Sequence, residues 1–222
     1  ANTLHERHGL LRKDPVTGKA VYCFIHGNWA LDNSRPDGRW CGVDNEIDIL
    51  VETGCYADMT MPSAPSDTQT RKINSIYFSR GRPGQRKSHD TGRDVRAGRW
   101  GDAGELLLIQ GPLTLNWKEA KFWIVPRIES AELSLDAPPT PHRVRLWADC
   151  GICVEGAEEH VFVKVHTHGA TEKSMQMLFA QGGLELLWSE LERLYRSRDG
   201  GTLRYVTAWE MYSRIRELAL GR

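Results

Sequence analysis

The sequence has no apolar run that approaches the roughly 20 residues needed to cross a bilayer. Its N-terminus lacks the basic, apolar and small-residue order of a signal peptide. It also has no excess of charge of one sign, because 29 basic residues balance 29 acidic ones. Without a general basic field, the chain is a poor candidate for binding nucleic acid. We therefore expect a cytoplasmic protein with no nucleic-acid partner and no membrane partner.

Cysteine is also scarce, with five residues, an odd number in a chain too large to depend on disulfides. Cys150 and Cys153 follow a helix-like segment, whereas a redox pair needs its first thiolate at a helix N-terminus. A structural zinc site would need a second pair with similar spacing, which the other three cysteines do not form. We expect reduced, partly buried thiols.

Strand-like and helix-like segments alternate along the chain. We expect strands over residues 21–26, 56–61, 106–110, 161–168 and 203–207, and helices over residues 44–53, 143–150, 172–180, 184–196 and 209–220. Such alternation is typical of βαβ units. The pattern predicts an α/β fold, a partial or distorted (β/α) barrel with mainly parallel strands, formed by one domain over residues 1–222.

The segment 161–168 has the most informative pattern. Val161, Val163 and Val165 share one face of the expected strand, and Phe162, Lys164, His166 and His168 share the other. Two imidazoles two residues apart on a strand project the same way, so His166 and His168 can approach one metal or one reacting group. The His-x-His spacing resembles that of amidohydrolase barrels, where the pair belongs to the first strand.

Polar residues gather at the ends of the expected strands. They are His26, Asn28, Asp58, Thr60, Gln110, His166, His168 and Thr207. Each has an ordinary structural explanation when taken alone. The carboxyl ends of parallel strands meet at one rim, however, so their joint occurrence favours a site there. Trp29 beside this rim can stack on a sugar ring or fill a core, and the sequence leaves both open.

Three segments carry a family resemblance. They read Phe24-Ile25-His26-Gly27-Asn28-Trp29-Ala30-Leu31, then Asn45 to Tyr56, then Val163-Lys164-Val165-His166-Thr167-His168-Gly169. Together they resemble the later part of polysaccharide deacetylases of the carbohydrate esterase family 4 type, whose fold is a distorted (β/α) barrel. The family's early Asp-Asp pair and its His-x-x-x-His metal motif have no counterpart, and Ile25 stands where the family has Arg.

The resemblance implies a metal-dependent hydrolase that removes acetyl groups from carbohydrate. It implies that His166 or His168 is the general acid, that Asp58 orients an imidazole, and that the sugar is bound near the rim by His26, Asn28, Trp29 and Gln110. A divalent metal, with zinc favoured, is expected, and its main ligands are expected upstream of Ala1 in a segment lost by truncation. Such a fragment would be inactive and, with an exposed sheet edge beside residues 21–26, prone to self-association.

Two alternatives stay open. The chain can be a non-catalytic carbohydrate-binding or regulatory domain that keeps the barrel rim without a metal centre. It can also be an amidohydrolase-like enzyme that uses His166 and His168 as metal ligands.

Overall fold

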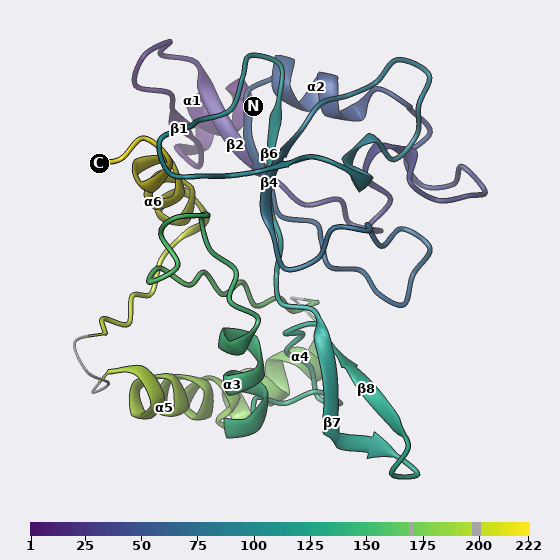
Figure 1. The fold of residues 1–222 in the computed structure, drawn as a ribbon, viewed down its shortest axis with the longest axis vertical. Coiled ribbons are helices and arrows are strands. Elements are labelled where there is room, and N and C mark those ends of the chain that lie inside the picture. Colours follow the sequence, from purple (N-terminus) through teal and green to yellow (C-terminus); the bar gives the residue numbers. More distant parts are fainter. Residues whose placement is uncertain (169–170, 197–200) are drawn as a thin grey trace. The chain divides into compact units, whose positions relative to one another are not determined.

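A computed structural model describes residues 1–168, 171–196 and 201–222, which form two compact units (Figure 1). Unit 1 consists of Ala1–Gln110, Cys153–His160 and Thr207–Arg222, and unit 2 of Gly111–Ile152 and Val161–Val206. In the described ranges, no helix is both long enough and apolar enough to cross a membrane.

Unit 1 is built on a six-stranded sheet. Its strands, in spatial order, are β1 (Arg12–Lys13), β2 (Ala20–Phe24), β3 (Cys55–Asp58), β6 (Leu106–Ile109), β4 (Ile76–Ser79) and β5 (Arg93–Asp94). The middle strands β2, β3 and β6 run parallel, as the sequence predicts, whereas β1, β4 and β5 are each antiparallel to the strand they pair with.

The predicted barrel with mainly parallel strands is wrong, because the described strands form an open, mixed sheet. The cause lies between β3 and β6. A parallel connection needs a crossover, usually a helix, and the polar segment after β3 contains no helix with an apolar face. The chain instead adds β4, whose four residues are all buried, antiparallel to β6.

Three α-helices complete unit 1. They are α1 (Asn2–His8), α2 (Glu46–Glu52) and α6 (Ala208–Ala219), and two 3-10 turns, η1 (Leu31–Asn33) and η2 (Ser88–Asp90), lie in its loops. The positions of α2 and α6 match the helices predicted at 44–53 and 209–220. Ile47 and Leu50 of α2 pack with Leu31, Tyr77 and Leu108 in the core.

Unit 2 contains a two-stranded hairpin and helices. The hairpin consists of β7 (Thr114–Lys121) and β8 (Val125–Glu129), and it is followed by α3 (Pro141–Asp149), α4 (Glu172–Met175), the π-helical turn η3 (Gln176–Ala180) and α5 (Gly183–Tyr195). The helices match the predicted ones. Their core includes Trp147, Met177 and Leu187.

The strands predicted at 161–168 and 203–207 do not form. Val161 and Val165 are 46% and 39% exposed, so the valine face is not buried against a sheet. The segment forms an isolated bridge, where Leu133 N donates to His166 O (2.8 Å) and His166 N donates to Ala131 O (3.2 Å). Phe162 N also donates to Ile152 O (2.8 Å), and Val163 packs against the core of unit 2. Residues 201–207 are irregular up to the start of α6. Gly169, part of the family resemblance, lies outside the described residues.

Candidate functional site

The carboxyl ends of β2 and β3 place three of the predicted rim residues together. The N–H of His26 donates to Thr60 Oγ1 (2.8 Å), and that hydroxyl donates to Asp58 Oδ2 (2.8 Å). Asp58 Oδ1 also accepts the N–H of Thr60 (3.0 Å). Asp58 is 1% exposed, and these bonds show its carboxylate fixing the backbone beside His26. Asp58 therefore positions His26 through Thr60.

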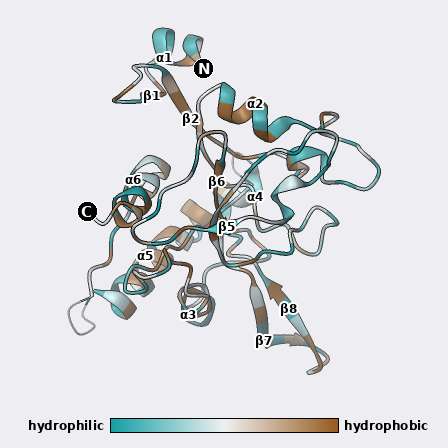
Figure 2. Ribbon diagram, turned by 45° about the horizontal axis from the view of Figure 1, so that its top comes forward, coloured by the Kyte–Doolittle hydropathy of each residue, from teal (hydrophilic) through white to brown (hydrophobic). Residues whose placement is uncertain are grey.

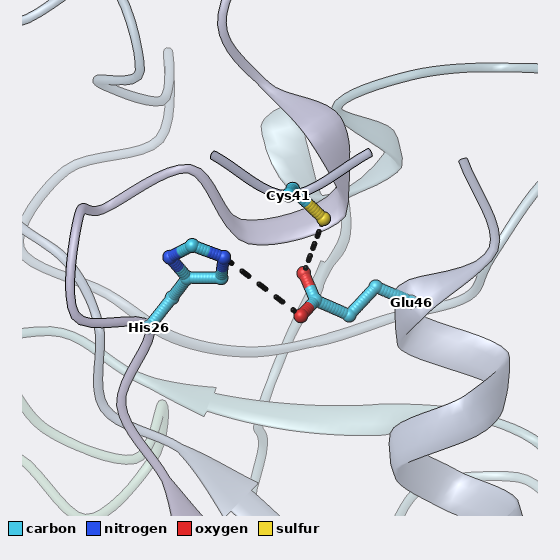
Figure 3. A group of neighbouring side chains, drawn as sticks. All are labelled: His26, Cys41 and Glu46. Carbon is cyan, nitrogen blue, oxygen red and sulfur yellow. Dashed lines mark hydrogen bonds and ion pairs between the residues drawn. The ribbon is translucent and has the colours of Figure 1, made fainter. Parts of the chain in front are cut away.

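The His26 ring lies between backbone donors and a carboxylate. Nδ1 accepts the N–H groups of Ala30 (3.2 Å) and Asn28 (3.4 Å), and Nε2 lies 3.9 Å from Glu46 Oε1 (Figure 3). A neutral imidazole has one donor and one acceptor nitrogen. Since Nδ1 accepts, the neutral ring holds its proton on Nε2, toward Glu46.

Glu46 stands in the first turn of α2 and joins His26 to a thiol. Its Oε2 accepts the N–H of Asp32 (2.7 Å) and lies 3.2 Å from Cys41 Sγ, which donates to it. Burial raises the pKa of Cys41, and Glu46 adds to the rise. The thiol is therefore protonated at neutral pH.

One ligand atom from each of His26, Cys41 and Glu46 lies within 4.8 Å of the others (Figure 3). Imidazole, thiolate and carboxylate are all zinc ligands, and three protein ligands leave a fourth position open, as in catalytic zinc sites. Binding would remove the Cys41 proton and move the His26 proton to Nδ1. A protonated Nδ1 would no longer accept the N–H groups of Ala30 and Asn28. Both of these hydrogen bonds are long, at 3.2 and 3.4 Å, so little is lost with them. The donor set therefore fits a zinc-type ion.

The loop that carries these groups is held in a constrained shape. Trp29, Asp32 and Asn33 have left-handed φ angles of 56°, 52° and 50°, a conformation that costs most non-glycine residues stability. Buried Asp32 accepts the N–H of Ser88 through Oδ2 (2.7 Å), and Arg86 Nε donates to Asn33 O (3.0 Å). Contacts from the η2 region thus fix the loop between His26 and Glu46.

The other residues predicted to bind sugar have different surroundings. Asn28 is exposed and Trp29 half-buried, both next to His26. Gln110 is 2% exposed, and its amide donates to Thr70 Oγ1 (3.1 Å) and Lys72 O (2.8 Å). Its Oε1 accepts the N–H of Ser75 (3.1 Å). Gln110 therefore ties the end of β6 to the segment before β4.

His166 and His168 belong to unit 2 and are not in the sheet that carries His26 and Asp58. Burial, together with Lys164, lowers the pKa of His166 to about 4. A general acid needs a pKa near the working pH, so this direction does not favour that role for His166. His168 is exposed.

The sequence interpretation missed Cys41 and Glu46. Cys41 lies in a loop rich in Gly, Asp and Asn, and Glu46 is one of several acidic residues at the start of α2. The available signal was a histidine, a cysteine and a glutamate within 21 residues around one strand end, but their spacing follows no recurrent metal motif.

Comparisons with protein families, with characterised proteins and with solved structures found no match to this chain.

Proposed function

We propose that the chain is a metal-dependent hydrolase that removes acetyl groups from carbohydrate, with a divalent metal, zinc favoured, at His26, Cys41 and Glu46. The convergence of three unlike ligand atoms within 4.8 Å carries the proposal. The resemblance to polysaccharide deacetylases supports the substrate class. The proposal moves the metal site from the upstream segment into unit 1.

Each residue has a defined task in this proposal. A bound divalent metal supplies Lewis acidity toward the acetyl carbonyl and makes water a stronger nucleophile. Asp32 orients Glu46 through its N–H, and Asp58 with Thr60 fixes the backbone of His26. Asn28 and Trp29 follow His26 closely in the sequence and are the groups we assign to the sugar.

Metal binding by the full chain is the first test. We expect about one zinc ion per chain, and Cys41→Ser and Glu46→Gln should each weaken zinc binding by at least about 100-fold in a chelator competition. Cys153→Ser is the matched control, because Cys153 is also a half-buried free thiol of unit 1 but lies outside the cluster. Equal zinc affinity in wild type and Cys41→Ser would contradict the proposed site.

Acetyl release is the second test. Acetate released from an acetylated oligosaccharide should depend on added zinc and be lost in Glu46→Gln. Zinc binding without acetate release would retain the metal site and reject the hydrolase.

A non-catalytic carbohydrate-binding or regulatory domain remains the second candidate. The sequence favours it in one respect, because the family's Asp-Asp pair and its His-x-x-x-His metal motif have no counterpart in this chain. Sugar binding that is unaffected by a chelator would support it. The amidohydrolase-like alternative has no such support, because no three-ligand group in the described chain includes His166 or His168.

We also propose the cytoplasm as the compartment. All five cysteines have free thiols, which is the state that a reducing compartment maintains.

A further inference from the structure

The β7–β8 hairpin of unit 2 ends in an exposed apolar turn. Phe122, Trp123, Ile124 and Val125 are 84%, 94%, 74% and 54% exposed. Figure 2 shows hydrophobic colour at this end of the hairpin. We call these four residues the hairpin tip. Large apolar side chains exposed in one continuous group mark an interaction site more often than isolated ones do.

The backbone of the hairpin tip does not favour aromatic residues. Phe122 and Trp123 have left-handed φ angles of 52° and 65°, and Ile124 N donates to Lys121 O (3.2 Å) to close the turn. Glycine or asparagine adopts these angles with less strain and is the usual choice in tight hairpins. Turn formation therefore does not explain the aromatic pair.

The charges next to the hairpin tip are positive. Lys118 and Lys121 are exposed and form no ion pair within the described chain, whereas the nearby Glu119 carboxylate is paired with Arg127 (2.9 Å). The hairpin therefore combines an apolar tip with two lysines on β7, the strand that leads into the tip.

We propose that the hairpin tip inserts into the interface of a membrane that contains anionic lipid. Aromatic side chains favour the boundary between headgroups and acyl chains. Lysine side chains can extend from there to anionic headgroups. This departs from the sequence-based expectation of no membrane partner, and it concerns peripheral binding.

A second copy of the chain is the less suitable occupant. To bind a second copy, the projecting hairpin tip would need an apolar hollow on the surface of that copy. Two hollows on the described surface have charged side chains in their lining, with Arg96, Glu155 and Glu158 in one and Glu192 and Arg196 in the other, so neither is a purely apolar receptor for the tip. A lipid interface, by contrast, adapts to a projecting group.

Co-sedimentation of the full chain with vesicles tests the proposal. Binding to phosphatidylcholine vesicles that contain phosphatidylserine should fall by about tenfold or more in Phe122→Asn/Trp123→Gly. This variant should fold as stably as wild type, because the new residues suit the turn. Lys118→Glu/Lys121→Glu should lose the preference for phosphatidylserine. Trp188→Gln on α5, which removes a half-exposed tryptophan elsewhere in unit 2, is the control and should bind like wild type.

Three results would overturn the proposal. The first is no vesicle binding by wild type, and the second is equal binding by wild type and the Phe122→Asn/Trp123→Gly variant. The third is concentration-dependent self-association that this variant abolishes without any vesicle binding, which would assign the tip to a second copy.

Discussion

Arg143 of α3 shows how a single side chain organises unit 2. It is 2% exposed, and its Nε and Nη2 donate to the two carboxylate oxygens of Glu129 (2.7 and 2.8 Å). Trp147 Nε1 donates to the same carboxylate (2.9 Å). Burial alone would raise the pKa of Glu129, but Arg143 and Trp147 hold it below its usual value. The pair therefore stays ionised and links β8 to α3.

Removing one partner of this pair should be costly. Arg143→Met leaves the Glu129 charge buried and unpaired, so we expect a loss of about 3–5 kcal/mol in the free energy of unfolding measured with urea. Glu129→Met/Arg143→Met should lose less than the single variant, because no charge is then left alone. Arg145→Met, an exposed change on the same helix, should have almost no effect. If the double variant is as unstable as the single one, the unpaired charge is not the main cost, and the hydrogen bonds that both variants lose, from Arg143 to the backbone carbonyls of Glu132, Ala137 and Pro138, account for the loss.

At the scale of elements, the helices could be predicted and several strands could not. α5 and α6 have apolar residues at helical spacing, a local signal that packing does not reverse. Residues 161–168 alternate as a strand should, but strand formation requires a partner, and sequence alternation does not identify one. Likewise, the short apolar run Ile-Tyr-Phe of β4 within a polar segment does not reveal its antiparallel pairing.

The start of α6 gives a test at this scale. Thr207 Oγ1 accepts the N–H of Glu210 (3.3 Å), and Glu210 Oε2 accepts the N–H of Thr207 (2.7 Å), which together form a capping box. Thr207→Ala should lower the free energy of unfolding by about 1 kcal/mol, and Thr207→Ser should restore it. Glu217→Gln, which removes only an exposed ion pair of α6 with Arg214, is the control. An equal loss in the control would argue against the cap.

At the scale of the whole molecule, part of the predicted rim exists and part does not. His26, Asp58 and Thr60 come together because β2 and β3 are parallel neighbours, a relation that strand ends in the sequence can indicate. The sequence could not show that His166 and His168 lie outside this rim. Whether a segment joins a sheet depends on residues far away in the chain, and the local pattern does not identify them. The edge expected to be exposed beside residues 21–26 is covered by β1, whose Arg12 and Lys13 are charged. Short charged edges resist pairing, and self-association stays a prediction.

Both units contain a histidine whose burial sets how stability responds to acid. His89 in unit 1 is fully buried, and neither ring nitrogen has a hydrogen-bond partner among the described residues. Burial, with Lys87, lowers the pKa of His89 to about 3, and burial with Lys164 lowers that of His166 to about 4. The unfolded chain protonates both near pH 6.5. It therefore binds more protons than the folded chain below that pH.

Stability should consequently fall as the pH drops below about 6.5, because protons favour the state that binds more of them. For His89 alone we expect a loss of about 2 kcal/mol in the free energy of unfolding between pH 7 and pH 5. His89→Leu should remove this part of the slope and, at neutral pH, unfold no more easily than wild type, since it also removes two unpartnered polar atoms. Asp32, whose pKa burial raises, acts in the opposite direction. It is present in both wild type and His89→Leu, so the difference between these two proteins isolates His89.

Urea unfolding at several pH values measures how the free energy of unfolding depends on pH, with the exposed His8→Gln as control. A slope unchanged in His89→Leu would mean that His89 is protonated or hydrated in the folded protein.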